Sequence, residues 1–163
     1  MKEMMSYRLT EAIFGKLIKV QDDVYASLKA NPELAKRYRP PFGAAGSEAT
    51  PGIDGIVSAI DRIPELKRAI ANAGLTTRQY LLASAAVMQA MMIDAMMQTY
   101  GNAPGDLPAA LKENLAFLRT HRAEVYRMRS RGMEVEQLAR RAQGEGDASI
   151  PEWRLDSGGV KHP

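Results

Sequence analysis

The 163-residue sequence contains no cysteine, only two histidines and few aromatic residues, which make up 6% of the chain. The absence of cysteine excludes disulfide bonds, cysteine-ligated zinc and thiol catalysis. The formal net charge is only +3, so composition does not require a nucleic acid or an anionic membrane as partner. With 45% hydrophobic and 25% charged residues, the sequence is typical of a soluble globular protein of one domain.

Catalytic and cofactor motifs are also missing from the sequence. The glycine-containing segment 43–47 lacks the lysine of a phosphate-binding loop. The serines Ser47, Ser58 and Ser84 do not lie in a nucleophile elbow. We therefore expect no cofactor, and an enzyme is the third choice among the function classes.

Hydrophobic periodicity predicts an all-α fold. Helical patterns cover residues 9–30, 32–38, 53–72 with an interruption at Pro64, 76–100, and 108 to about 140. We predict a single-domain bundle of about four main helices plus short helices over residues 1–143. Residues 144–163 carry little periodicity and form a C-terminal tail, either partly disordered or packed onto the bundle through Trp153.

The segment 76–100 is the most distinctive helix. Thr76 and Gln79 form a capping box at its start, and Asp94 is the one charged residue between Gln79 and Tyr100. A helix that is apolar on all sides is either buried or spans a membrane. Because the run is rich in alanine and contains Asp94, we predict no membrane span and a buried central Met/Ala-rich helix.

Methionines are concentrated in this helix, at positions 88, 91, 92, 96 and 97. Flexible core packing is the leading interpretation of the methionines. A second interpretation is a pliable groove for a partner or ligand, formed by Met88, Met92, Met96 and Asp94. A third is a soft-metal site for copper, or a haem site, that uses Met88, Met92, Met96 and His121.

Asp94 requires a partner in such a helix, because a buried carboxylate is costly unless it is paired or neutralised. The candidate partners on the later helix are Arg119, Arg122 and His121. We expect an ion pair or a hydrogen bond. The alternative is a carboxylic acid with a raised pKa in a cavity.

Arginines are frequent from residue 119 to residue 141, but Glu124, Glu134 and Glu136 are interspersed among them. Tyr126 is the only aromatic residue close by. Nucleic-acid binding needs a contiguous basic face with stacking or groove-reading side chains. We therefore predict a solvated helix face and no nucleic-acid partner.

Two segments carry a resemblance to known proteins. Residues 73–80 read Ala-Gly-Leu-Thr-Thr-Arg-Gln-Tyr before the Ala/Met-rich helix, and residues 115–124 read Leu-Ala-Phe-Leu-Arg-Thr-His-Arg-Ala-Glu. Over roughly residues 53–128 the chain resembles a group of uncharacterised, often exported bacterial proteins with an Ala-Gly-Leu-Thr-x-Arg-Glu-Tyr motif. The resemblance implies an all-α fold and a periplasmic or secreted location. It implies no activity and no site residues.

These observations favour a non-enzymatic binding or interaction module, with soft-metal or haem binding as the alternative. The partner would be an unknown protein or a small apolar ligand, and a homodimer is one way to cover exposed methionines. The N-terminal residues 1–7 have no apolar core, so we expect that they are not a signal peptide. We expect a periplasmic or secreted protein if a signal peptide was removed, and a cytoplasmic one otherwise.

Overall fold

The computed structural model describes residues 3, 6–38, 52–101, 105 and 107–144, and within these residues every regular element is a helix. The all-α prediction is therefore confirmed. The helices are α2 (Glu11–Ala30), α3 (Pro32–Arg37), α4 (Ile53–Asp61), α5 (Pro64–Asn72), α6 (Thr77–Tyr100), α7 (Ala109–Thr120) and α8 (Arg122–Ala142). The predicted tail lies outside the described residues beyond Gly144, and so does Trp153.

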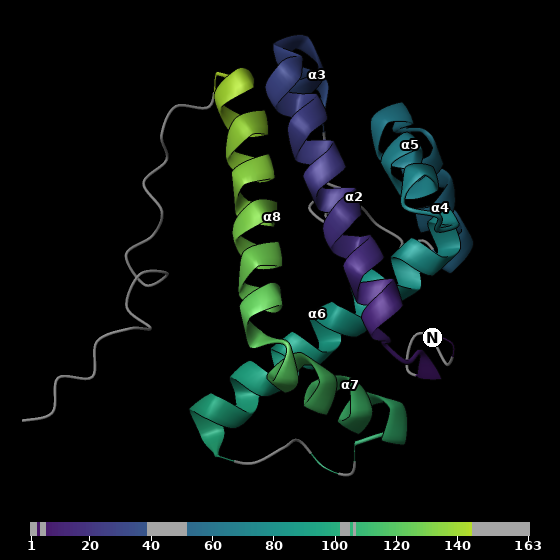
Figure 1. Cartoon of the computed structure of the whole chain (residues 1–163), viewed down its shortest axis with the longest axis vertical. Coiled ribbons are helices and arrows are strands. Elements are labelled where there is room, and N and C mark those ends of the chain that lie inside the picture. Colours follow the sequence, from purple (N-terminus) through teal and green to yellow (C-terminus); the bar gives the residue numbers. More distant parts are fainter. Residues whose placement is uncertain (1–2, 4–5, 39–51, 102–104, 106, 145–163) are drawn as a thin grey trace, which may run out of the picture.

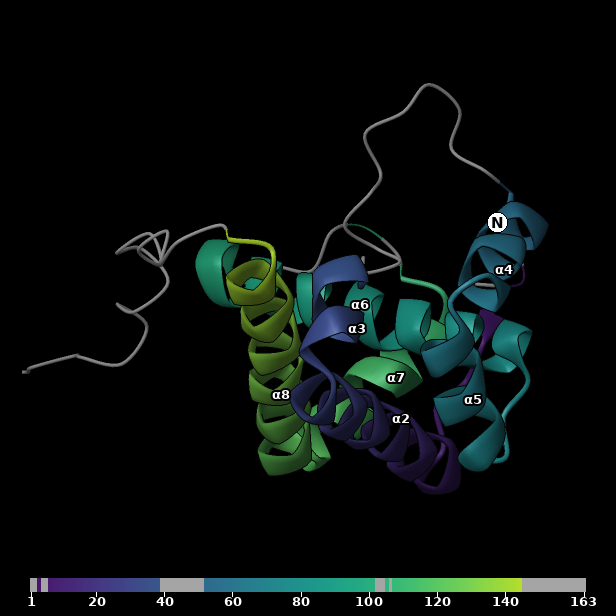
Figure 2. The same ribbon diagram turned by 90° about the horizontal axis from the view of Figure 1, so that it is seen from above.

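The long helices α2 and α8 lie side by side, and α6 crosses behind them (Figure 1). Seen from above, α3 and α8 lie on one side of α2, and α4 and α5 lie on the other (Figure 2). Helix α7 packs along α6, whereas α8 packs on α2 and α3. The core at the centre of this arrangement includes the fully buried side chains of Val20, Ile60 and Leu81.

Local signals in the sequence set most helix ends. The Asn31 side chain accepts a hydrogen bond from the amide of Leu34, and Pro32 occupies the first turn of α3. Pro64 begins α5 rather than interrupting a longer helix. This confirms the predicted interruption at Pro64, which could have been a sharp kink or a division and is a division into two short helices. Proline lacks the amide hydrogen that a helix interior requires.

The predicted capping box at the start of α6 is also present. The Thr76 hydroxyl accepts a hydrogen bond from the Gln79 amide at 3.1 Å. The Gln79 side chain in turn accepts one from the Thr76 amide at 3.0 Å. At the other end Gly101 has φ +76°, a left-handed conformation that glycine adopts without a steric cost and that ends the helix.

The sequence pattern did not predict the break between α7 and α8, which falls at His121. No proline or glycine marks this position. The His121 ring packs on the Phe117 ring, with the centroids 4.2 Å apart, and lies 6.2 Å from the ring of Phe14. The chain turns here because α7 packs against α6 and α8 packs against α2 and α3.

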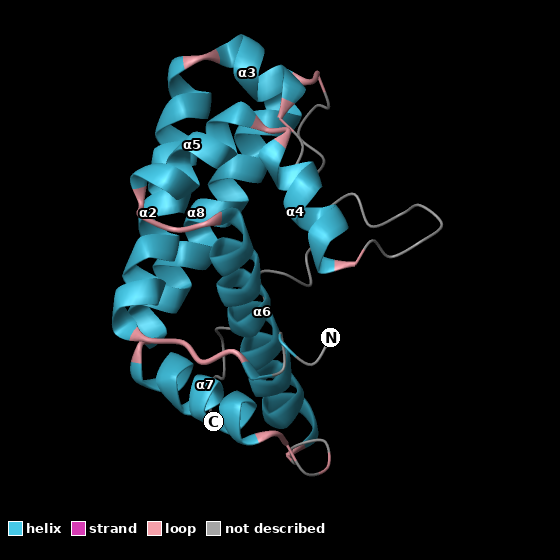
Figure 3. Ribbon diagram, turned by 90° about the vertical axis from the view of Figure 1, so that its right-hand side faces the viewer, coloured by secondary structure: helices cyan, strands magenta, loops and turns pink. Residues whose placement is uncertain are grey.

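The burial of α6 differs from the prediction. Every residue from Tyr80 to Val87 is buried except the half-buried Ser84. Beyond Val87, three methionines are exposed: Met88 by 50%, Met92 by 60% and Met96 by 39%. The predicted burial of the whole segment 76–100 is therefore wrong for its second half. The reason is positional, since α4 and α5 lie near the first end of α6 and α7 lies along the rest (Figure 3).

By length and composition alone, α6 is long and apolar enough to cross a membrane. Half of its most apolar window is buried inside the protein. The core helix of a soluble protein has the same two properties. That the chain has no membrane span stays a prediction.

Candidate ligand-binding groove

Helices α6 and α8 diverge from each other. Within the described part of the chain, no Cα atom of α6 comes within 8 Å of one of α8. Two clefts lie between them. We call the first, of about 200 Å³, the inner cleft, and the second, of about 300 Å³, the outer cleft. Met91 lines both, so the two clefts adjoin, and together we call them the α6–α8 groove.

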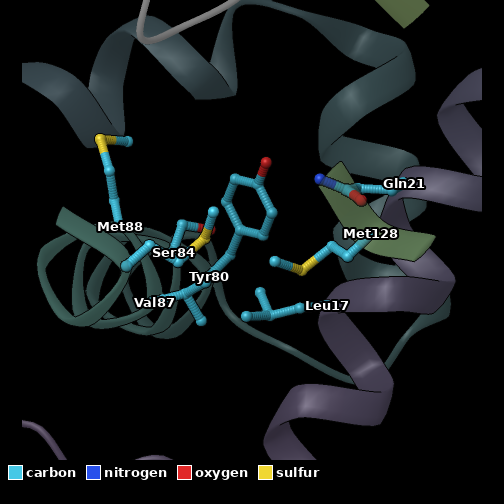
Figure 4. A pocket seen from close by; sticks show the side chains of 8 residues that line it. Leu17, Gln21, Tyr80, Ser84, Val87, Met88 and Met128 are labelled. Atoms are coloured by element: carbon cyan, nitrogen blue, oxygen red, sulfur yellow. The ribbon is translucent and has the colours of Figure 1, made fainter. Parts of the chain in front are cut away.

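The inner cleft is mainly apolar. Its apolar lining comes from three helices, with Leu17 on α2, Val87, Met88 and Met91 on α6, and Met128 on α8. The Tyr80 ring stands at the centre, with Met88 on one side and Met128 on the other (Figure 4). An apolar cleft with a few polar groups is the usual form of a small-molecule site.

Three polar side chains complete the inner cleft, those of Gln21, Tyr80 and Ser84. Burial raises the pKa of the Tyr80 phenol above its usual value, and a hydrogen bond with the Ser84 side chain offsets part of this rise. The side-chain oxygen of Gln21 is buried and has no hydrogen-bond partner among the described residues. An unpaired buried amide oxygen costs free energy, which a donor entering the cleft would recover.

The outer cleft combines an apolar floor with a charged wall. The floor includes Met91, Ala95, Leu118 and Val125, which come from α6, α7 and α8. The wall is formed on α8 by Arg122, Tyr126 and Arg129. These three residues share one helix face, because side chains four and seven positions apart point in nearly the same direction.

Asp94 lies at the edge of the outer cleft, and its carboxylate is paired. It accepts a hydrogen bond from Nε of Arg119 at 2.8 Å and another from the side-chain amide Nε2 of Gln98 at 2.8 Å. Its side chain is 23% exposed. The predicted ion pair is therefore confirmed, and among the three candidate partners it is Arg119 that makes it.

Arg122 and Arg129 differ from Arg119 in this respect. Neither forms an ion pair with a described carboxylate. Both are exposed. The outer cleft therefore carries two positive charges that the described part of the protein does not neutralise. Between them in the sequence lies Tyr126, whose side chain is 75% exposed.

The structure separates the residues that the sequence grouped into one site. Met88 lines the inner cleft and Asp94 the outer cleft, whereas Met92 and Met96 line neither of the two. The ring of His121 contacts the aromatic rings of Phe14 and Phe117. Within the described residues, no group of three or more His, Asp or Glu side chains is placed to hold a metal ion.

Several groove residues were missed by sequence reasoning, namely Gln21, Tyr80, Arg122, Tyr126 and Arg129. The spacing of Arg122, Tyr126 and Arg129 was a usable signal, since it places two arginines and a tyrosine on one helix face. Gln21 and Tyr80 carried no such signal. They come together only because α2 and α6 cross.

Comparison with known proteins adds no assignment: no protein-family model, curated protein or solved structure matches the chain.

Proposed function

We propose that the protein is a non-enzymatic binding module and that its α6–α8 groove receives a small apolar molecule. The observation that supports this most directly is the pair of adjoining clefts between helices that do not pack on each other. Methionines supply much of the apolar lining, and their flexible thioether side chains adapt to ligands of different shape. The few polar groups in the lining would orient the ligand.

We also propose that α2, α6, α7 and α8 act as one bundle of four main helices with α6 at its centre. Helix α6 contacts α2, α4, α5 and α7, which supports a central role for it. In this arrangement the bundle holds the walls of the groove apart, while the short helices cover the first half of α6. The predicted location and the predicted absence of a nucleic-acid partner stay predictions.

The binding proposal is tested with N-phenyl-1-naphthylamine, an apolar probe whose fluorescence rises on leaving water. We expect the full-length protein to bind it. Ser84→Leu, which places a larger side chain in the inner cleft, should weaken binding by about tenfold. Ser84→Ala is the matched control, because it removes the hydroxyl and leaves the cleft open, and it should bind within about twofold of the wild type.

Circular dichroism and a thermal melt show whether Ser84→Leu is folded. A folded Ser84→Leu variant that binds the probe as the wild type does would remove the inner cleft from the proposal. A wild-type protein that leaves the probe's fluorescence unchanged would overturn the proposal entirely.

Copper binding is a second candidate, which one observation favours. Met88, Met92 and Met96 lie one helical turn apart on an exposed face of α6, and thioether sulfur is a soft ligand suited to Cu(I). Ligation of copper or haem by His121 is not favoured, because the His121 ring packs against the rings of Phe14 and Phe117.

Titration of Cu(I) against the chelator bicinchoninate tests this candidate. We expect the variant with leucine at positions 88, 92 and 96 to lose copper binding. Met133→Leu, at an exposed methionine of α8, should keep it. A copper titration that leaves the thermal melt of the wild type unchanged would eliminate the copper candidate.

A further inference from the structure

We infer that the ligand of the α6–α8 groove is an amphipathic anion of fatty-acid type, with its carboxylate at Arg122 and Arg129 and its hydrocarbon chain extending toward the inner cleft. This inference rests on the proposed binding function and adds the chemical class of the ligand. It follows from the uneven distribution of charge and apolar surface along the groove.

The charge lies at one end of the groove. Arg122 and Arg129 line the outer cleft, seven residues apart on one face of α8, and have no described carboxylate as partner. Among the described residues that line this cleft, Asp94 carries the only carboxylate, and Arg119 already engages it at 2.8 Å. An anion in the outer cleft would therefore meet two available guanidinium groups, which bind carboxylates through charge-assisted hydrogen bonds.

The apolar surface continues from this charged end through Met91, the residue that the two clefts share. Beyond it lie the side chains of Val87, Met88 and Met128 (Figure 4). A hydrocarbon chain extending past Met91 would bury its methylene groups against these residues. Each methylene buried in this way should tighten binding by about fourfold.

Other ligand classes fit the groove less well. A cationic amphiphile would place its charge beside the two arginines, where like charges repel. A neutral apolar molecule would use the apolar surface and gain nothing from the two guanidinium groups, which are exposed and stay hydrated. A second copy of the chain or a partner helix would have to bring its own carboxylates to Arg122 and Arg129. We favour the small anion because a single carboxylate can bind the two arginines on one face of α8 and a hydrocarbon chain fits clefts of about 200 and 300 Å³.

The experiment compares three twelve-carbon molecules that differ in the charge of the head group: dodecanoate, 1-dodecanol and dodecyltrimethylammonium. Displacement of N-phenyl-1-naphthylamine from the full-length protein measures the affinity for each, with dodecanoate and the cation below their micelle concentrations and dodecanol below its solubility limit. We expect dodecanoate to bind about fivefold more tightly than dodecanol, and the cation to bind most weakly. This preference should shrink as salt rises, because salt screens exposed charges.

The second part of the experiment repeats the displacement measurement on variants in which the two arginines are substituted. The Arg122→Gln, Arg129→Gln double variant should weaken dodecanoate binding by about tenfold and leave dodecanol binding unchanged. The matched control is Arg127→Gln, an exposed residue of α8 that lines neither cleft. Its dodecanoate affinity should equal that of the wild type.

The outcomes separate this inference from the proposed function. Equal binding of dodecanoate and dodecanol, or a loss of dodecanoate binding in Arg127→Gln as large as in the double variant, overturns the inference and leaves the proposed function standing. Failure of every apolar molecule to bind overturns both. Probe binding that falls as protein concentration rises, with a matching increase in sedimenting mass, shows that a second copy occupies the groove and also overturns the inference.

Discussion

The two halves of α6 are both apolar and lie in different environments. Residues 80–87 consist mainly of alanine, leucine and valine, whereas residues 88–97 contain five methionines and one charged residue, Asp94. The first half is enclosed by protein on nearly every side, whereas the second half exposes Met88, Met92 and Met96. The difference shows that the hydrophobicity of a helix sets how much burial would stabilise it. The neighbouring helices decide how much burial it receives.

The same comparison separates stability from function in this molecule. The first half of α6 contributes Leu81, Ala83 and Ala86 to the core, with no exposed surface at any of them. The second half contributes an exposed methionine face and part of the floor of the outer cleft. Exposed apolar surface stabilises a folded chain little, so its presence beside two clefts favours a role in binding.

Truncation of one large side chain in each half gives the largest expected contrast. Leu81→Ala should lower the free energy of unfolding by about 3 kcal/mol, because it opens a cavity in the core. Met92→Ala should change it by less than about 0.5 kcal/mol, because its side chain is already in water. Urea denaturation measures both values. Comparable losses would mean that the second half of α6 is buried in solution.

Alkaline pH tests the buried half through its tyrosine. Burial raises the pKa of Tyr80 and of Tyr38 above the usual value near 10. Below pH 10 both phenols are protonated in the folded and unfolded states. Above it the unfolded state releases protons that the folded state retains. Stability should therefore fall by about 1.4 kcal/mol per pH unit for each tyrosine, until the pH reaches the folded-state pKa.

Tyr80→Phe is the control for this pH dependence. Burial also raises the pKa of Tyr7, so the substitution removes one of three such phenols and should reduce the slope of stability against pH just above pH 10 by about a third. Urea denaturation at several alkaline pH values measures the slope. An unchanged slope in Tyr80→Phe would contradict the burial of this phenol.

Gln21 faces the buried half of α6 across the inner cleft, and we expect its replacement by an apolar residue to stabilise the protein. Its side-chain oxygen is buried without a hydrogen-bond partner. Gln21→Met keeps a similar shape and removes the unpaired group, so it should raise the free energy of unfolding by about 1 kcal/mol. Thermal denaturation checks the sign. A loss of stability would show that the amide oxygen is hydrogen-bonded in solution.

Asp94 belongs to the exposed half of α6, and its substitution should change the free energy of unfolding least among these variants. Asp94→Asn weakens the ion pair with Arg119, which is partly exposed on both sides. Such pairs contribute about 1 kcal/mol or less. The loss should shrink further in high salt, while the effect of Leu81→Ala should not. A loss as large as that of Leu81→Ala would mean that the pair is desolvated in the folded protein.

Much of the fold was predictable because its signals are local. Asn31 with Pro32, Pro64, and Thr76 with Gln79 each mark a helix start through hydrogen bonds or steric limits within a few residues. The break at His121 was not predictable, because it results from the packing of Phe14 against Phe117 and from the different partners of α7 and α8. The pairing of Asp94 was predictable in kind, since the cost of an unpaired carboxylate in an apolar helix requires a partner.

The sequence by itself determined that the chain is helical, where most helices begin and end, and that α6 contains the longest run without a charged residue, at positions 79–93. Local hydrogen bonding and side-chain periodicity fix these properties. Only the tertiary structure decided that the second half of α6 is exposed and that α6 and α8 diverge. The same is true of the placement of Arg122 and Arg129 beside an apolar cleft. These features depend on contacts between residues far apart in the chain, which the spacing of neighbouring residues does not encode.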